Sequence, residues 1–352
     1  MSEALPAALA IDGGNSKTDV ALVAQDGTLL ALVRGPGMPV RLGPQTVGVI
    51  AELIGSAVRL AGLEQAGGQP SGGQQAGTGT VAAHLVACVA NVDLPAEERE
   101  LERMLSEQAW TGTTLVANDT YAVLRAGLDD VPAAGAQRHW GVGVTCGTGI
   151  NCVGLAPDGS TAGFLALGMT TGDWGGGGGL GLEAQWNAVR AEDGRGPQTA
   201  LREAVPAYFG LKDPLDVAEA LHLGEISWDR IASLAPIVLR VADAGDEVAR
   251  GLVLRLAQEI FLLVSSAVTR LGLAAEPVPV VLGGGVVASG NSLLIEHTTG
   301  LITATFPAAD VRVLRQVPVA GAALLGLDLA VASLEAKHRL RGAFSNRSAA
   351  GA

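Results

Sequence analysis

Near the N-terminus, a carboxylate, two glycines and several side-chain donors follow one another in the segment DGGNSKT at positions 12–18. The apolar residues 9–11 before it are typical of a buried strand, and residues 19–23 after it are typical of a returning strand. Gly13 and Gly14 permit a tight turn whose backbone N–H groups can face an anion. A Walker A loop would need a glycine just before Lys17 and a helix just after Thr18, and neither is present. The pattern therefore predicts a β-hairpin that binds a phosphate group.

A second segment repeats this design. The stretch 140–155 contains a Gly- and Val-rich strand, the turn CGTGIN at 146–151 and a returning strand. Each copy then reaches an Asp-Gly pair, at 26–27 and at 158–159, which is typical of a hairpin turn. Taken singly, each copy fits an ordinary hairpin of an α/β protein. The repeat favours two related domains, each with a phosphate-facing hairpin.

Two further segments fit a nucleotide-binding protein. Asp119 follows the predicted strand 114–117 and precedes the predicted helix 121–127, so it lies at the carboxyl end of a strand, where open α/β sheets bind ligands. Near the C-terminus, three glycines at 283–285 follow a short apolar strand. A flat ring could lie against such a turn, because the turn has no side chains.

With these four segments in order, the chain resembles the superfamily of acetate kinase, sugar kinases, Hsp70 and actin. Within it, the chain is most similar to N-acetylglucosamine kinases and BadF/BadG/BcrA/BcrD-type ATPases. The segments that carry the resemblance are DGGNSKT at 12–18, ANDT at 117–120, CGTGIN at 146–151, TGDWGG at 171–176, LGGGV at 282–286 and PVAGAALLGL at 318–327. The resemblance implies an α/β protein of two actin-like (ribonuclease H-like) domains with a nucleotide cleft between them.

The same resemblance implies roles for particular residues in phosphoryl transfer from ATP. Asp119 would accept or orient the hydroxyl proton of the acceptor, and Asp12 would hold Mg²⁺. The remaining cofactor-binding residues are Gly13, Gly14, Asn15, Ser16, Lys17, Thr18, Gly147, Thr148, Gly149, Gly283, Gly284 and Gly285. Structural alternatives remain open, because Asp119 could cap the following helix, Asp12 could stabilise its turn and Lys17 could be solvated.

The acceptor site departs from the N-acetylglucosamine kinases. Their Ser-Thr-Asn element after the third strand is replaced by GPGMPVRLG at 35–43, and their GDEG element by GDWG at 172–175. The expected substrate-binding residues are Asn118, Asn151, Asp173, Trp174 and Arg41. Trp174 could stack on a pyranose or fill an apolar gap, and Arg41 could pair with a carboxylate or be solvated. Together they permit an acidic amino sugar such as N-acetylmuramic acid. The glycine run 175–179 is either a hinge or a disordered stretch.

Composition limits the partners and the compartment. The chain has 352 residues, 48% of them hydrophobic, with a formal net charge of -12, which argues against nucleic acid or an anionic membrane as a partner. Its cysteines, Cys88, Cys146 and Cys152, are few, and neither a secretory signal nor a long apolar span is evident, which favours a reducing cytoplasm. The related activases hold an iron–sulfur cluster at a dimer interface through cysteines. Here all three cysteines resemble small core residues.

The predicted organisation has three parts, an N-terminal domain at 1–137, a C-terminal domain at 138–335 and a helix end with a frayed tail at 336–352. A flexible insertion is predicted at 67–79, where Gly, Gln and Ser dominate. Residues 180–268 read as helices interrupted at Pro206, Pro214 and Pro236.

The sequence therefore predicts a cytoplasmic, ATP- and Mg²⁺-dependent kinase of an amino sugar, with N-acetylglucosamine as the first candidate. The alternatives are a kinase of N-acetylmuramic acid or another hexosamine, an activase-type ATPase coupled to a partner, and a sugar or nucleotide sensor that is not an enzyme. A small-molecule sugar is the expected partner, and a homodimer is left open.

Overall fold

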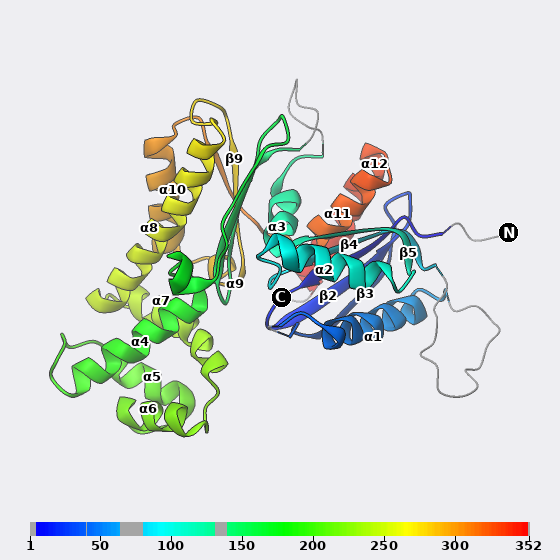
Figure 1. The fold of residues 1–352 in the computed structure, drawn as a ribbon. Helices are drawn as coiled ribbons and strands as arrows, with labels where there is room; N and C mark the ends of the chain where they lie inside the picture. The colour runs from blue at the N-terminus through cyan, green and yellow to red at the C-terminus, as the bar shows by residue number, and fades with distance from the viewer. Residues whose placement is uncertain (1–4, 40, 64–79, 131–138, 351–352) are drawn as a thin grey trace. The chain divides into compact units, whose positions relative to one another are not determined.

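The chain folds into two compact α/β units that have the same sheet topology. The computed structural model describes residues 5–39, 41–63, 80–130 and 139–350, so the predicted insertion at 67–79 lies outside the described residues. One unit contains Met1–His139 and Leu314–Ala352, and the other contains Trp140–Val313. Each unit has one five-stranded mixed sheet, drawn in Figure 1. The duplication predicted from the two hairpins is therefore present in the fold.

The sheet of the first unit has the order β3-β2-β1-β4-β5. β1 pairs antiparallel with β2 and parallel with β4, so the β1–β2 hairpin turn lies at the same edge as the carboxyl ends of β4 and β5. The strands are β1 (Ala8–Gly13), β2 (Lys17–Val23), β3 (Leu29–Pro36), β4 (Ala82–Val89) and β5 (Thr111–Asn118). This register brings the first glycine turn and the segment that begins at Asp119 to one edge of the sheet.

Both faces of this sheet are covered by helices, which explains why residues 8–11 of β1 are apolar on both faces. Leu9 and Ile11 face a cluster shared with α1 (Pro44–Leu60) and α2 (Pro95–Ser106). Ala8 and Ala10 alternate with them and face a cluster shared with α3 (Asp119–Gly127), α11 (Val319–Leu329) and α12 (Leu334–Ala350). The side chains of β1 on the α11 face are small, so α11 can approach the sheet closely.

The sheet of the second unit has the order β10-β9-β6-β7-β8, in which β6, β7 and β8 are antiparallel and β9 and β10 continue in parallel. The strands are β6 (Gly141–Cys146), β7 (Ile150–Leu155), β8 (Thr161–Gly163), β9 (Pro279–Gly283) and β10 (Asp310–Val313). β8 is short, and a 3-10 helix, η1 (Gly168–Thr171), follows closely. The second glycine turn joins β6 to β7, as the first joins β1 to β2.

Helices between β8 and β9 make up the rest of the second unit. They are α4 (Gly176–Glu192), α5 (Leu201–Phe209), α6 (Pro214–Leu223), the 3-10 helix η2 (Trp228–Leu234), α7 (Ala235–Asp243) and α8 (Glu247–Arg270), and α9 (Gly285–Ala288) and α10 (Ser292–Thr305) follow β9. Pro214 and Pro236 lie in the first turns of α6 and α7, where proline fits a helix start. Pro206 is a correction, because it lies buried inside α5 and does not interrupt it.

The helix α8 is long and apolar enough to span a membrane by length and composition. It contradicts the expectation of no long apolar span. Its buried residues include Leu252, Leu256 and Ile260, and it packs against α7, α10 and the strand β7. We therefore describe α8 as a core helix of the second unit, beside α10 in Figure 1.

The contacts of α11 correct the predicted domain boundary, which assigned residues 314–335 to the second domain. α11 packs against α3 and the strands β1, β2 and β4 of the first unit. A Cβ at Gly321 would lie 1.9 Å from the carbonyl oxygen of Ala122, and a Cβ at Gly326 would lie 2.5 Å from the Cβ of Ala8. These small residues give α11 a surface that fits the first sheet, so the chain returns to that sheet after β10.

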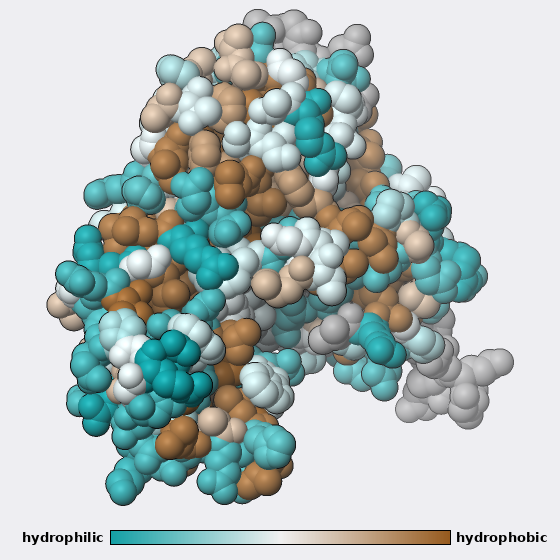
Figure 2. Space-filling model, turned by 60° about the vertical axis from the view of Figure 1, so that its left-hand side comes forward, coloured by the Kyte–Doolittle hydropathy of each residue, from teal (hydrophilic) through white to brown (hydrophobic). Residues whose placement is uncertain are grey.

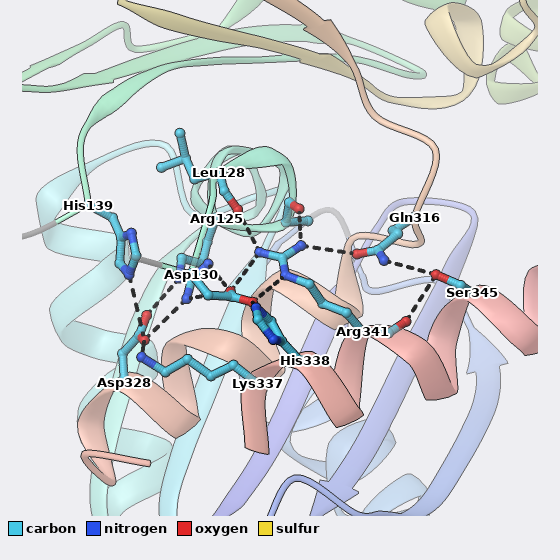
Figure 3. Close-up of polar contacts among 11 residues, drawn as sticks. Arg125, Leu128, Asp130, His139, Gln316, Asp328, Lys337, His338, Arg341 and Ser345 are labelled. Carbon is cyan, nitrogen blue, oxygen red and sulfur yellow. Dashed lines mark hydrogen bonds and ion pairs between the residues drawn. The ribbon is translucent and has the colours of Figure 1, made fainter. Parts of the chain in front are cut away.

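The predicted frayed tail from Gly342 is also corrected, because α12 continues as a helix to Ala350. Phe344 is 1% exposed within the cluster on the α11 face of the first sheet. A polar network, drawn in Figure 3, fixes the same helix to the end of α3. Arg341 donates from Nε to Asp130 at 2.9 Å, and the buried Arg125 donates to Asp130 at 3.3 Å and to Asp328 at 2.7 Å. Burial of an aromatic ring and these ion pairs hold α12 on the first unit.

Substituting Gly321 with alanine tests the close packing of α11 on α3. The added methyl group would overlap backbone atoms of Ala122, which cannot move without displacing α3. We expect the free energy of unfolding in urea to fall by about 1–3 kcal/mol. The matched control is Gly342→Ala in α12, where a Cβ meets nothing within 4 Å, so helix propensity should leave stability unchanged or slightly higher. Equal stability of the two variants would contradict the packing described here.

Candidate active site

The first glycine turn presents polar groups at the sheet edge as the sequence predicted. Asn15, Ser16 and Lys17 are exposed, and Gly14 N–H donates to the carbonyl of Lys17 at 2.9 Å to close the turn. The loop after β3 lies against it, because a Cβ at Gly37 would be 2.0 Å from the carbonyl oxygen of Asn15. The turn is therefore held in one conformation by backbone contacts, with three of the predicted phosphate-binding residues at the surface.

Thr18 departs from the prediction of a phosphate donor. It pairs with Gly13 across the β1–β2 ladder and its side chain is 0% exposed. Its hydroxyl has no hydrogen-bond partner among the described residues. The alternation of side chains along β2 places Lys17 and Thr18 on opposite faces, so only the lysine reaches the surface.

Asp12 lies in a row of charged residues that crosses three strands. Asp19 is opposite Asp12 on β2, and Arg34 is opposite Asp19 on β3. The guanidinium of Arg34 donates to both carboxylate oxygens of Asp19, at 2.7 and 2.9 Å. We did not predict Asp19 or Arg34 from the sequence. Their spacing from Asp12 becomes informative only once the strand register is known.

The surroundings of Asp12 favour its neutral form. Burial raises the pKa of Asp12 to about 8, and the negative charges of Asp119 and Asp19 contribute, while Lys17 and Arg34 act in the opposite direction. Asp12 is 8% exposed. A nearby cation would stabilise the ionised form of a carboxylate in this environment.

Asp119 is the first residue of α3, but it is not the helix cap. The cap is Asn118, whose side chain accepts a hydrogen bond from Thr120 N–H at 3.0 Å. The alternative in which Asp119 caps α3 is therefore wrong, because Asn118 is the cap. Burial raises the pKa of Asp119 to about 6, against hydrogen bonds from Thr120 that lower it. Asp119 is thus a partly buried carboxylate that is mostly ionised at neutral pH and able to accept a proton.

Asn118 makes structural contacts that the sequence did not reveal. Besides capping α3, its amide Nδ2 donates to the carbonyl of Val92 at 3.2 Å and to the Asp93 carboxylate at 3.0 Å. Both amide protons thereby have protein partners. These contacts join the end of β5 to the loop after β4, and they favour a structural role over the predicted contact with sugar.

In the second unit, the N-terminus of α4 lies directly on the second glycine turn. Gly177 N–H donates to the carbonyl of Gly147 at 2.7 Å, and Gly178 N–H donates to that of Thr148 at 2.8 Å. Gly176 has φ +64°, and a Cβ there would lie 2.4 Å from the carbonyl oxygen of Gly149. The glycine run is therefore neither a hinge loop nor disordered. It begins a helix and allows that helix to touch the turn.

The third glycine segment lies beside the second turn. Gly284 has φ +91°, and a Cβ there would lie 2.4 Å from the carbonyl carbon and oxygen of Cys146. The backbone nitrogen of Gly285 is 3.9 Å from where a Cβ of Gly147 would be. The predicted phosphate-binding residues 147–149 and adenosine-binding residues 283–285 are thus neighbours at one edge of the second sheet.

The predicted sugar-binding residues of the second unit lie close to this turn. Asn151 follows it on β7, where its side chain accepts a hydrogen bond from Cys152 N–H at 2.7 Å. Asp173 and Trp174 lie in the loop before α4, and the Thr171 hydroxyl donates to Asp173. The indole of Trp174 is covered by the guanidinium of Arg255, whose Cζ is 3.9 Å from the ring centroid. Arg255 is a candidate residue that no local motif indicated.

Arg41 lies in the loop between β3 and α1 and is exposed. Within the described part of the chain, no hydrogen bond or ion pair fixes its side chain. The structure thus places Arg41 on the surface of the first unit, as a solvated residue would be.

The residues around Asp12 fit a magnesium ion. Two partly or fully buried carboxylates, Asp12 and Asp119, have raised pKa values, which a divalent cation would reverse. Mg²⁺ is usually bound by one or two carboxylates together with waters and substrate phosphates, so a larger protein cage is not required. Among the described residues no group of three or more His, Cys, Asp or Glu side chains forms such a cage.

A separate cavity of about 290 Å³ opens in the second unit between α4, α6 and η2. Its walls include Trp186, Trp228 and Leu221, and Arg190 lies over the Trp186 ring at 4.4 Å. Apolar and polar side chains alternate over the helical part of this unit in Figure 2. None of the predicted site residues lines this cavity.

Comparisons with known proteins agree with the resemblance seen in the sequence. The model of the BadF/BadG/BcrA/BcrD ATPase family matches residues 9–326. A curated N-acetylmuramic acid/N-acetylglucosamine kinase from Clostridium acetobutylicum is 27% identical over 290 residues, covering 82% of this chain and 88% of the relative. An N-acetyl-D-glucosamine kinase from Dictyostelium discoideum is 26% identical over 233 residues, covering 66% of this chain and 72% of the relative.

Solved structures share the fold. The structure of a candidate N-acetylglucosamine kinase from Chromobacterium violaceum superposes with a TM-score of 0.66 at 24% identity, covering 91% of this chain and 98% of that one. A glucokinase from Streptomyces griseus, solved with glucose and AMPPNP, gives a TM-score of 0.52 at 17% identity, covering 92% and 98%. The actin-like fold expected from the sequence is therefore present.

Proposed function

This chain belongs to the BadF/BadG/BcrA/BcrD ATPase family, and from that membership we propose that it is an ATP-dependent kinase that phosphorylates a hydroxyl of an amino sugar. N-acetylglucosamine is the first candidate substrate, since two curated relatives are kinases of that sugar by name. The observation that carries the proposal is the pair of carboxylates, Asp12 and Asp119, whose charges interact at the sheet edge beside the first glycine turn. Phosphoryl transfer to a hydroxyl needs this combination of a metal ligand and a proton acceptor next to phosphate-binding groups.

In the proposed reaction, Asp119 accepts the proton of the attacking sugar hydroxyl. Its pKa of about 6 leaves it ionised at neutral pH yet basic enough to take up a proton as the oxygen attacks phosphorus. The hydrogen bonds of Asn118 hold the start of α3, and thereby Asp119, at the end of β5. Asp12 would hold Mg²⁺, which when bound neutralises charge on the transferred phosphoryl group.

The glycine turns supply the phosphate-binding groups in this proposal. The first turn presents the side chains of Asn15, Ser16 and Lys17 at the surface. In the second unit, the exposed Thr148 and Gly149 lie beside the N-terminus of α4. Because the Lys17 cation and the positive end of the α4 dipole both attract anions, both turns suit the phosphates of ATP. Gly283, Gly284 and Gly285 would accept the adenosine, since a turn without side chains leaves room for a flat ring.

The activase alternative receives no support from the cysteines. Cys88, Cys146 and Cys152 are all buried, so none is presented at a surface where a cluster could be shared. Burial also raises the pKa of Cys146 to about 12, which disfavours the thiolate form that binds iron. A location in the cytoplasm is part of the proposal, and fractionation would test it. Light scattering would decide whether the protein is a monomer or the homodimer that the sequence left open.

Release of ADP from ATP and Mg²⁺ in the presence of different sugars tests the proposed function. The panel is glucose, glucosamine, N-acetylglucosamine, N-acetylmannosamine and N-acetylmuramic acid. We expect an N-acetylated sugar to stimulate ADP release and to appear as a phosphorylated product by mass spectrometry. Slow ADP release that no sugar changes would instead favour a partner-coupled ATPase, and ATP binding without turnover would favour a sensor.

A further inference from the structure

Arg255 in the middle of α8 is held in a defined orientation next to the loop that contains Asp173. Its Cζ lies 3.9 Å from the ring centroid of Trp174, and its Nη1 donates to the Glu183 carboxylate at 3.0 Å. The next residue of α8, Leu256, also meets this loop, because a Cβ at Gly175 would lie 2.9 Å from its Cδ1. One aromatic contact and one ion pair thus fix a guanidinium beside the predicted sugar-binding loop.

Most of the hydrogen-bonding capacity of this guanidinium is unused. Within the part of the chain that the structure describes, the bond from Nη1 is the only hydrogen bond of the Arg255 side chain. The side chain is 46% exposed, and its Nε and Nη2 make no hydrogen bond among the described residues, so both can donate to a ligand. The edge formed by Nε and Nη2 offers two parallel N–H groups, the geometry that matches a carboxylate. Because the side chain is already ordered, a carboxylate that binds there loses little additional conformational entropy.

The stacking role expected for Trp174 is changed by the same contacts. Arg255 covers the ring, and a Cβ at Gly179 in α4 would lie 3.6 to 3.8 Å from three atoms of the indole. The indole is therefore in contact with protein on α4 and on α8. The indole supports the guanidinium. The charged group available to a ligand is therefore the guanidinium of Arg255 and not the ring of Trp174.

We propose that Arg255 determines specificity by binding a carboxylate on the acceptor sugar, with Trp174 and Glu183 as positioning residues. N-acetylmuramic acid has this chemistry, since it is N-acetylglucosamine with a lactyl ether that ends in a carboxylate. The inference rests on the proposed sugar kinase function. It replaces Arg41 in the role that the sequence suggested for it, because the Arg41 side chain is exposed and makes no hydrogen bond or ion pair among the described residues.

The test compares N-acetylmuramic acid with N-acetylglucosamine as acceptors for the wild-type protein and for Arg255→Gln. We expect the KM for the acidic sugar to rise about tenfold or more, because a charge-assisted hydrogen-bond pair is lost. The KM for the neutral sugar and both kcat values should stay within about twofold. Arg255→Lys should give an intermediate KM for the acidic sugar, because it keeps the charge and loses the fork. The matched control is Arg250→Gln, an exposed arginine of the same helix.

Three results would overturn the proposal. An equal loss for both sugars would show that Arg255 only maintains the loop around Trp174. A selective loss in Arg41→Gln, with none in Arg255→Gln, would return the role to Arg41. Wild-type protein that phosphorylates N-acetylglucosamine but neither phosphorylates nor binds N-acetylmuramic acid by calorimetry would refute acid recognition and leave the kinase function standing. Absence of phosphorylation of every sugar would refute the kinase function itself.

Discussion

Asp119→Asn should lower kcat for sugar phosphorylation by about 10²- to 10⁴-fold while leaving the affinity for ATP within about twofold. An amide of the same shape cannot take up the proton of the acceptor hydroxyl. The local fold should survive the change, because Asn118 and not Asp119 caps α3. A coupled assay of ADP release gives kcat, and calorimetric titration with a non-hydrolysable ATP analogue gives the affinity.

The pH dependence of kcat in the wild-type protein should reflect the ionisation of Asp119. A general base must be ionised, and the pKa of Asp119 is about 6 without metal and lower with a cation bound nearby, so kcat at saturating Mg²⁺ should fall only at a pH below about 6. The residual kcat of Asp119→Asn should not show this fall at low pH. Asp129→Asn, which removes an exposed carboxylate after the same helix, is the matched control and should behave as wild type. Turnover that survives in Asp119→Asn would remove Asp119 from the reaction.

Asp12→Asn should abolish most Mg²⁺-dependent turnover and at the same time stabilise the metal-free protein at alkaline pH. We expect a loss on the order of 100-fold or more in kcat, because a bound divalent cation contributes several kcal/mol to charge stabilisation. Added Mg²⁺ with ADP should raise the Tm of the wild-type protein and have a smaller effect on the variant.

The gain in stability follows from the raised pKa of Asp12. That pKa is about 8 in the folded protein and 3.8 for an ordinary aspartate, so between these values the folded state binds a proton that the unfolded chain does not. The contribution of Asp12 to the free energy of unfolding is therefore greatest below pH about 4 and is lost as the pH rises through about 8. Asparagine stays neutral, so at pH about 8.5 without Mg²⁺ the variant should be more stable by on the order of 5 kcal/mol.

Urea denaturation of the wild-type protein and Asp12→Asn at pH about 5 and about 8.5 measures this difference. The difference between the two proteins should be smaller at the lower pH, where Asp12 is neutral in the folded state and ionised only in the unfolded chain. Asp158→Asn in the second unit is the control, since it removes an exposed carboxylate from a β-turn. A variant that is less stable than wild type at pH about 8.5 would show that the ionised carboxylate has stabilising partners beyond Lys17 and Arg34.

The sequence by itself determined the elements whose signals are local. The glycine turns at 13–14 and 147–149 needed small residues between apolar strands, and the Asp-Gly pairs that followed marked the second turns. The order of these segments predicted the duplicated sheet, and both sheets have that topology. Asp12 could be selected because it lies near the end of an apolar strand, and Asp119 because it follows a strand, and the parallel pairing of β1, β4 and β5 brings both to one edge.

Tertiary structure alone decided the features that depend on distant partners. The return of α11 to the first sheet rests on contacts of Gly321 and Gly326 with residues about 200 to 320 positions away, which no local pattern reveals. The tail is helical because Phe344 and Arg341 find partners in the first unit. In each case the free energy comes from burial and ion pairing between segments far apart in the sequence.

The same limit explains the corrections within the candidate site. From the sequence alone, a glycine run is expected to be flexible. The structure shows that Gly176 lies against the turn at Gly149, which fixes the run. The exchange of roles between Asn118 and Asp119 at the start of α3 depends on which side chain reaches Thr120 N–H. The Asp19–Arg34 pair and the cover of Arg255 over Trp174 follow from strand register and helix packing. Residue types and turns determined where the chemistry could occur. Folding decided which residue could fill each role, because the energies of charge interactions and hydrogen bonds depend on the distance between the partners in space.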